Sequence, residues 1–353
     1  MFDRLDNINS YKEIDPNGMT DLISKFPEMM VDASKISSDV LFDFLDKPKN
    51  IVFCGMGGSA ISADIASVIL SKFGDIPSSV VRGYNLPHFV NTDSLVIILS
   101  YSGNTEETLS CYYQALNRTK NIVVISSGGK VLDLAIANKN VLFKIPKGLP
   151  PRASMPYLLI PIIFVINKFF IEAKLLDQVN EAYKTLVELK EKIGVNIPLK
   201  DNLAKQISSK IADKIIYIFG SEGGSDVAAY RFKCQLSENS KKNSFNNSFP
   251  ELNHNEIVNL SFYNQQNITA ILLRDSNESK QMQNRIEATK KILSKSKIEI
   301  AEIYSAGQSL LSKILSLCYF GDYVSLYLSI LSGIDPMPVK PIDELKEELE
   351  KRK

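Results

Sequence analysis

Residues 95–108 read LVIILSYSGNTEET and join an apolar run to a turn that is rich in hydroxyl groups. The apolar run predicts a buried strand, and a helix is predicted to begin near Glu106. The first N–H groups of such a helix have no partner within it and lie at the positive end of its dipole. Ser100, Ser102 and Thr105 add hydroxyl donors without adding charge. Together these groups predict a binding site for a phosphomonoester.

A second turn of this kind follows another apolar run, residues 51–54. The turn reads GMGGS over residues 55–59 and precedes a helical pattern over residues 60–73. Alone it indicates only the geometry of a strand-to-helix turn. Because ligands bind at the carboxyl ends of parallel strands, we expect Gly58 and Ser59 to lie beside the first turn. The two turns then predict a pocket for a sugar phosphate.

The chain repeats this design in its second half. Residues 214–234 read KIIYIFGSEGGSDVAAYRFKC and resemble residues 50–69, NIVFCGMGGSAISADIASVI. Alternating strand and helix patterns predict an α/β fold of two parallel sheets, each with helices on both faces. Strands are predicted at 51–54, 79–81, 95–99, 121–126, 141–145, 269–273 and 298–303. Only the first half looks suited to phosphate, since the second has Asp275 where phosphate oxygens would lie.

The remaining segments are predicted to be helical. Residues 155–194 would bridge the halves, and helices over 309–331 and 343–352 would pack back on the body. A proline-rich segment, 335–341, separates these last two helices. The predicted domains are 1–154 with the phosphate site, a helical bridge at 155–200, a second sheet domain at 201–308, and C-terminal helices at 309–353.

Composition limits the class of protein. The net charge is +1 from 41 basic and 40 acidic residues, which gives no reason to expect nucleic acid or an anionic membrane as partner. The most apolar stretch, 157–170, is interrupted by polar residues and is interpreted as a core helix. Four dispersed cysteines and a polar N-terminus favour a cytoplasmic protein with reduced thiols. Histidines and cysteines do not cluster in the sequence, so no metal or organic cofactor is expected.

Three polar runs carry candidate catalytic groups. The run LSENSK contains Glu238, at the end of the helix that follows the second glycine-serine turn, and we expect Glu238 at the mouth of the second sheet. The run PELNHNE contains His254, one of 2 histidines in the chain. The run PRAS contains Arg152 and lies between the halves. Carboxylate, imidazole and guanidinium groups are typical of acid-base catalysis with charge stabilisation.

These residues resemble a known family, the archaeal-type bifunctional phosphoglucose/phosphomannose isomerases, which are built from two sugar isomerase (SIS) domains. The resemblance extends over nearly the whole chain. Its most specific motifs are GMGGSA at 55–60, SYSGNTEET at 100–108, PRAS at 151–154, GSEGGSDVAAYRFKCQLSENSK at 220–241, PELNHNEIV at 250–258 and IDELK at 342–346.

The resemblance implies roles for individual residues and a homodimer with shared active sites. It implies that the phosphate is held by Ser59, Ser100, Ser102 and Thr105. It implies that Glu238 moves a proton between C1 and C2 and that Arg152 supports the enediolate. It further implies that His254 of the neighbouring subunit opens the sugar ring, and that Lys346 assists ring opening or holds sugar hydroxyls. The implied substrates are hexose 6-phosphates: glucose 6-phosphate, fructose 6-phosphate and mannose 6-phosphate.

Each implied role suits the chemistry of its side chain. One carboxylate can take a proton from a carbon and return it to the next carbon, and a near-neutral imidazole can open the ring. A guanidinium stabilises the charge of an enediolate by about 3 kcal/mol. Glu251 is the alternative base, because it lies close to His254 in the sequence.

Other functions stay open at this stage. The family has a small hydroxyl-bearing residue near its last proline-rich segment, where this chain has Met337 and Val339. Activity on glucose 6-phosphate without mannose 6-phosphate is therefore one alternative. An amino-sugar phosphate isomerase is another, although its glutaminase domain has no counterpart here. A third is a non-catalytic SIS regulator that binds sugar phosphates, although no DNA-binding pattern precedes residue 51.

Overall fold

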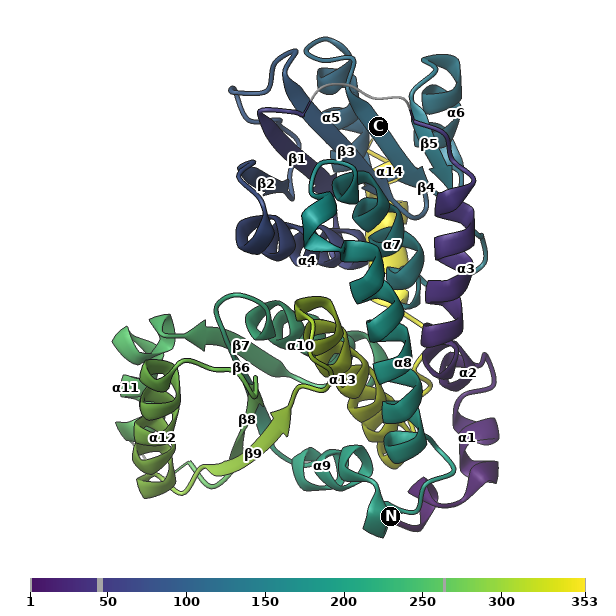
Figure 1. Cartoon of the computed structure of the whole chain (residues 1–353). Helices are drawn as coiled ribbons and strands as arrows, with labels where there is room; N and C mark the ends of the chain where they lie inside the picture. Colours follow the sequence, from purple (N-terminus) through teal and green to yellow (C-terminus); the bar gives the residue numbers. More distant parts are fainter. Residues whose placement is uncertain (1, 43–46, 263–264, 353) are drawn as a thin grey trace.

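The structure is a computed structural model that describes residues 2–42, 47–262 and 265–352 (Figure 1). Its strands are β1 (Asn50–Gly55), β2 (Ser78–Val81), β3 (Ser94–Ser100), β4 (Ile122–Ser126), β5 (Val141–Lys144), β6 (Ile215–Ser221), β7 (Ser244–Phe249), β8 (Ile268–Arg274) and β9 (Glu299–Tyr304). Its α-helices are α1 (Ile8–Ile14), α2 (Met19–Ser24), α3 (Phe26–Ser38), α4 (Gly57–Phe73), α5 (Glu106–Leu116), α6 (Gly129–Ala137), α7 (Met155–Asn167), α8 (Leu175–Ile193), α9 (Leu203–Ile211), α10 (Ser225–Asn239), α11 (Glu256–Phe262), α12 (Lys280–Lys295), α13 (Leu310–Ser332) and α14 (Lys340–Glu350). Short 3₁₀ helices are η1 (Phe2–Leu5), η2 (Pro151–Ala153), η3 (Ile171–Ala173), η4 (Leu199–Asp201) and η5 (Glu251–His254).

The strands form two parallel sheets with matching topology. The first has the order β2-β1-β3-β4-β5 and the second the order β7-β6-β8-β9. In each sheet the strand that precedes the glycine-serine turn pairs with the next long apolar strand, β1 with β3 and β6 with β8. The predicted α/β fold class and the predicted duplication are both confirmed.

The first sheet is apolar on both faces, which is why its strands read as continuous hydrophobic runs. Ile97 of β3 faces the core formed with α3, α4 and α7. Val96 and Ile98 face the opposite side, where Cys111 and Tyr112 of α5 cover them. The second sheet is covered in the same way, by α10 and α13 on one face and by α11 and α12 on the other.

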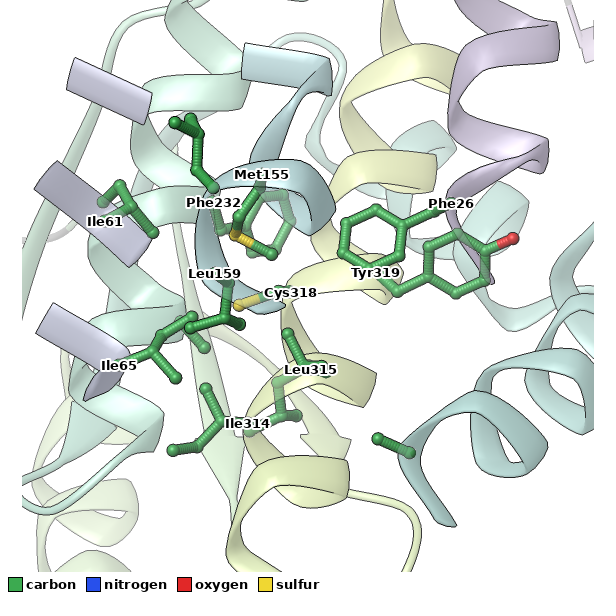
Figure 2. Close-up of a cluster of buried hydrophobic side chains, with 14 of the residues drawn as sticks. Phe26, Ile61, Ile65, Met155, Leu159, Phe232, Ile314, Leu315, Cys318 and Tyr319 are labelled. Atoms are coloured by element: carbon green, nitrogen blue, oxygen red, sulfur yellow. The ribbon is translucent and has the colours of Figure 1, made fainter. Parts of the chain in front are cut away.

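One apolar core joins the two halves. Figure 2 shows side chains from the central helices meeting in it, among them Ile65 of α4, Leu159 of α7, Phe232 of α10 and Cys318 of α13. Each of these four residues is at most 1% exposed. Because the core is continuous, packing of the central helices fixes how the first sheet lies against the second.

Helix α13 lies at the centre of this core. Its 23 residues are long and apolar enough to cross a membrane, but its most apolar window is 100% buried within the protein. The helices that cover it include α8, α9 and α10 (Figure 1). Its two charged side chains have partners: Lys313 lies 2.8 Å from Asp275, and Asp322 lies 2.7 Å from Arg231. Such burial is typical of the core helix of a globular protein.

Two parts of the chain differ from the predictions. Helix α14 has no buried residue, so the prediction that residues 343–352 pack on the body is wrong. Its apolar side chains Ile342, Leu345 and Leu349 are exposed. Strand β7 was not predicted, because SFNNSF has no apolar run; it forms an edge strand, where polar residues are tolerated.

Candidate active site

The two predicted phosphate turns lie side by side at the carboxyl edge of the first sheet. Gly55, the last residue of β1, pairs with Leu99 of β3. A Cβ atom on Gly55 would lie 3.0 Å from the carbonyl oxygen of Leu99 and 3.2 Å from Cβ of Ser59. Ser59 therefore lies next to Leu99 of β3, the residue that precedes Ser100. The structure brings these turns together as expected.

The turn after β3 is held by its own hydroxyl groups. Ser100 Oγ donates to Thr105 Oγ1 at 3.1 Å and accepts from the N–H of Gly103 at 3.1 Å. Gly103 has a φ of 72°, and a Cβ there would lie 1.6 Å from the carbonyl oxygen of Gly128, so glycine is required. Thr105 makes no side-chain cap for α5. The first N–H groups of that helix are thus not capped by Thr105 and can bind an anion.

Helix η2 brings Arg152 to the same edge. A Cβ on Gly58 would lie 2.8 Å from the carbonyl oxygen of Pro151, so this glycine allows η2 to pack directly against the start of α4. Arg152 is only 3% exposed. The guanidinium therefore lies between the phosphate turns and the second half of the molecule.

The guanidinium of Arg152 has a different partner on each edge. Nε donates to Asn239 Oδ1 at 2.7 Å, and Nη2 donates to the carbonyl oxygens of Pro336 at 2.7 Å and Met337 at 2.9 Å. Nη1 lies 3.5 Å from Glu238 Oε2. Burial lowers the pKa of Arg152 and the charge of Glu238 opposes that shift, so the group stays protonated at neutral pH. Among the described residues, Nη1 is the nitrogen left facing the carboxylate.

Glu238 lies at the opposite edge of the second sheet from the one predicted. Helix α10 begins at the carboxyl edge of that sheet and runs back over 15 residues, about 22 Å. Its last turn therefore lies at the amino edge, and the prediction that Glu238 stands at the mouth of the second sheet is wrong. This direction brings the side chain, which is 31% exposed, to Arg152. The candidate site thus joins the carboxyl edge of the first sheet to the amino edge of the second.

His254 is not brought to Glu238 within one chain. It ends η5, which follows β7, and β7 rises about 20 Å from the amino to the carboxyl edge over its 6 residues. His254 is exposed there, as is Glu251, which accepts a hydrogen bond from Asn255. The imidazole and Glu238 therefore lie at opposite ends of the second sheet.

Lys346 also lies apart from Arg152 and Glu238 in this structure. Its side chain is 68% exposed on α14, and its ion-pair contact is with Asp343 at 3.9 Å. However, the segment that leads into α14 is part of the site, because the carbonyl oxygens of Pro336 and Met337 bind Arg152. Helix α14 thus begins only three residues beyond a direct contact of the site.

Two site residues were missed by the sequence analysis, although both lie in the run that contains Glu238. Asn239 is fully buried and accepts a hydrogen bond from Arg152. Lys241 Nζ donates to the carbonyl oxygen of Glu238 at 2.6 Å and to that of Asp335 at 3.3 Å. Burial lowers the pKa of Lys241, and the charge of Arg152 adds to that effect. The sequence could have indicated both residues, because they lie next to the candidate base Glu238.

The second glycine-serine turn is unsuited to phosphate. Asp275 lines a cavity of about 220 Å³ beside this turn and pairs with Lys313 at 2.8 Å. Glu222 and Glu278 line the same cavity. Carboxylates at this edge would repel an anion. In the part of the chain that the structure describes, His, Cys, Asp and Glu side chains form no group of three or more that could hold a metal ion.

A wider cavity of about 420 Å³ lies between α4 and α10. Its lining includes Asp64, Asp226 and Tyr230, together with residues 246–248 of β7. It is near the beginning of α10, whereas Glu238 is near the end of that helix. The cavity therefore does not contain the predicted catalytic groups.

The fold and the two turns define a protein built from two SIS domains. Residues 44–132 match the family model described as SIS domain. Residues 200–349 match the model described as bacterial phospho-glucose isomerase C-terminal SIS domain. The two-domain organisation implied by the motifs is confirmed.

Full-length relatives narrow the class to one family. The bifunctional phosphoglucose/phosphomannose isomerase of Caldicellulosiruptor bescii is 38% identical over 94% of this chain and 98% of its own. The protein of the same name from Aquifex aeolicus is 34% identical over 86% of this chain and 91% of its own. The chain belongs to the bifunctional phosphoglucose/phosphomannose isomerase family.

Solved structures share the fold at lower identity. The C-terminal domain of glucosamine-fructose-6-phosphate aminotransferase from Francisella tularensis aligns with a TM-score of 0.70 at 15% identity, covering 91% of this chain and 98% of that one. A glucose-6-phosphate isomerase-like protein from Thermus thermophilus aligns with a TM-score of 0.64 at 16% identity, covering 97% of this chain and 98% of that one. These similarities support the fold alone.

Proposed function

We propose that the protein is a cytoplasmic aldose-ketose isomerase that interconverts glucose 6-phosphate with fructose 6-phosphate, and mannose 6-phosphate with fructose 6-phosphate. The names of its relatives support these substrates. The observation that carries the proposal is the pairing of Glu238 with Arg152 beside the phosphate turns. A base, a fixed cation and an anion site in that arrangement suit a sugar phosphate whose carbon acid is deprotonated next to a carbonyl.

The phosphate end of the substrate is bound by the first domain. Ser59, Ser102, Thr105 and the N–H groups at the start of α4 and α5, including that of Gly58, provide neutral donors. Ser100 contributes by donating its proton to Thr105 Oγ1, which orients the hydroxyl of Thr105. The charge of the phosphate is met by helix dipoles rather than by a lysine. Anchoring this end sets the distance from the phosphate to the reacting carbons.

The proton transfer is assigned to Glu238. In the direction from aldose to ketose, its carboxylate takes the proton from C2 to give a cis-enediolate. The proton of the C2 hydroxyl passes to the oxygen on C1, and the carboxyl group of Glu238 returns its proton to C1, which leaves the carbonyl on C2. Nη1 of Arg152 donates to the enediolate oxygens as their negative charge develops. The step needs no external oxidant or reductant, because C1 is reduced as C2 is oxidised, and the proposal assigns no part of it to a metal or an organic cofactor.

Ring opening is assigned to His254 of a second copy in a homodimer. Within one chain the length of β7, about 20 Å, separates the edge of the sheet where α10 ends from the edge where η5 begins, which supports assigning His254 to the site of the other subunit. Apolar side chains on the two elements that flank η5 are exposed, Phe245 by 50% and Val258 by 64%, which suits a subunit contact. Lys346 is assigned to the sugar hydroxyls or to ring opening.

The test is turnover by the purified chain without added metal. We expect fructose 6-phosphate to yield glucose 6-phosphate and mannose 6-phosphate, both detected by coupled assays, and Glu238→Gln to abolish both conversions. Glu251→Gln is the matched control and should retain activity. Loss in Glu251→Gln with activity in Glu238→Gln would move the base to Glu251.

The same assay separates the alternatives. Glucose 6-phosphate as the sole product would establish a single-specificity phosphoglucose isomerase. Binding of sugar phosphates without turnover would favour a non-catalytic regulator. Formation of glucosamine 6-phosphate in the presence of ammonia would favour an amino-sugar isomerase.

A further inference from the structure

A buried chain of hydrogen bonds links Arg152 to the centre of the molecule. Asn239 Oδ1 accepts from Nε of Arg152 at 2.7 Å, and Asn239 Nδ2 donates to Ser325 Oγ at 2.9 Å. Ser325 Oγ in turn donates to the carbonyl oxygen of Asp322 at 2.7 Å. Asn239 and Ser325 are both 0% exposed. The chain thus joins η2, α10 and α13 without contact with solvent.

The direction of these bonds is fixed by the backbone. A main-chain carbonyl can only accept, so the carbonyl of Asp322 takes the hydroxyl proton of Ser325. The oxygen of Ser325 is then left as an acceptor, and Asn239 must present its NH₂ group to it. The carbonyl end of the same amide therefore faces Nε of Arg152. Nε of Arg152 can only donate and requires the same orientation, so the Asn239 amide is held from both sides.

The backbone of Arg152 is held by the same cluster. Nη2 of Arg231 donates to the carbonyl oxygen of Arg152 at 3.1 Å. Arg231 is 2% exposed and is itself bound by Asp322 through Nε at 3.1 Å and Nη2 at 2.7 Å. Arg152 is thus fixed at its main chain by Arg231 and at its guanidinium by Asn239.

We propose that Asn239 and Ser325 are positioning residues that hold the guanidinium of Arg152 with Nη1 toward Glu238. This inference rests on the proposed function, in which Nη1 donates to the enediolate. Without the hydroxyl of Ser325 the buried NH₂ group of Asn239 loses its acceptor, so the amide is no longer anchored to α13 and holds Nε of Arg152 less firmly. The guanidinium would then lose its orientation, while the phosphate turns of the first domain would be unaffected.

The main experiment compares two serines of α13. Ser325→Ala removes the hydroxyl that orders the amide. Ser329→Ala is its matched control, because Ser329 is also 0% exposed and its hydroxyl makes the same kind of bond, 2.7 Å to the carbonyl of Leu326. We expect Ser325→Ala to lower kcat roughly five- to ten-fold with KM within about two-fold, and Ser329→Ala to change neither. Ser325→Thr, which keeps the hydroxyl, should restore kcat.

A double-mutant cycle with Arg152→Lys tests the route of the effect. If Ser325 acts through the guanidinium, Ser325→Ala will cause no further loss of kcat in the Arg152→Lys background. The same loss in both backgrounds, or equal losses in Ser325→Ala and Ser329→Ala, would overturn the inference.

The cycle also separates the inference from the proposed function. If Arg152→Lys lowers turnover but Ser325→Ala does not, the positioning inference alone fails. If Arg152→Lys retains full turnover, Arg152 does not support the enediolate, and both the proposed role and the inference fail. Thermal unfolding of all variants identifies any that lose activity through loss of fold.

Discussion

At the scale of single residues, the candidate site depends on one buried cation. Removing a partner from a buried charge typically costs 3–5 kcal/mol, so the protein must supply acceptors wherever water is excluded. Arg152 receives them from the carbonyl oxygens of Pro336 and Met337 and from the amide of Asn239. The same bonds that satisfy its charge also orient it. Stability and catalytic geometry therefore rest on the same contacts.

Substitution of one phosphate-turn hydroxyl should weaken substrate binding selectively. Ser102 is exposed at the carboxyl edge, and its Oγ accepts from the N–H of Asn104 at 3.3 Å. Hydrogen bonds to charged groups contribute about 1.5–3 kcal/mol, so Ser102→Ala should weaken binding of hexose 6-phosphates about 10- to 100-fold in calorimetric titrations. Ser110→Ala on α5, outside the turn, is the control and should bind normally. Equal affinities of the two variants would contradict a role for Ser102.

At the scale of elements, we expect α14 to contribute to activity but not to stability. Since none of its residues is buried, ending the chain after Val339 should change the free energy of unfolding by less than about 0.5 kcal/mol in urea denaturation. Activity should fall strongly, because Lys346 is lost. Lys346→Ala should reproduce the loss of activity, and Lys351→Ala, at the C-cap of the same helix, should not. A large drop in stability on truncation would show that α14 packs on the body after all.

The segment that leads into α13 has an outer cap from another helix, in addition to the N-cap Ser309, whose hydroxyl accepts from the N–H of Ser312. Glu181 of α8 accepts hydrogen bonds from the N–H groups of Gln308 at 2.6 Å and Ser309 at 3.1 Å. Burial alone would raise the pKa of Glu181, but these backbone bonds and the hydroxyls of Ser309 and Ser312 outweigh it, and the pKa is lowered. A carboxyl group with a lowered folded-state pKa stabilises the protein above its unfolded pKa and loses that effect as pH falls through the folded value.

The cap gives a pH-dependent prediction. At pH 7, Glu181→Gln should lower the free energy of unfolding by about 1 kcal/mol, because the hydrogen bonds to the charged carboxylate become weaker bonds to a neutral amide. The difference in unfolding free energy between the wild type and this variant should shrink as the pH falls below about 4.5, the ordinary pKa of a glutamate side chain. Urea denaturation between pH 7 and pH 3 measures it, with Glu188→Gln, exposed on the same helix, as control. A difference that stays constant with pH would mean that the charge of Glu181 does not stabilise the cap.

What the sequence predicted at this scale depended on apolar patterning. Strand β3 was evident because LVIIL is buried on both faces. Strand β7 was not, because an edge strand needs few apolar residues and SFNNSF has few. The exposed apolar stripe of α14 was interpreted as a packing face, although within one chain nothing covers it among the described residues.

At the scale of the whole molecule, the two halves have the same topology but different chemistry. The shared core formed by α4, α7, α10 and α13 joins the halves, and the end of α10 contacts η2, which itself packs on the start of α4. The sequence could predict the helix that contains Glu238. It could not predict the contact of that helix with Arg152, because this contact depends on how the central helices pack. The two members of the proposed catalytic pair therefore come from different halves, Arg152 from η2 and Glu238 from α10.

The position of His254 makes shared active sites testable by mixing two inactive chains. Glu238→Gln lacks the base and His254→Ala lacks the ring-opening group, and we expect each homodimer to be inactive. In a mixed dimer with two-fold symmetry, one site combines both defects and the other combines the intact Glu238 of one chain with the intact His254 of the other. Random mixing gives half mixed dimers, so about a quarter of wild-type activity should return after co-refolding of equal amounts. If His254 served its own chain, every site would keep one defect and no activity would return, and the separation of about 20 Å along β7 would then require the second domain to rearrange.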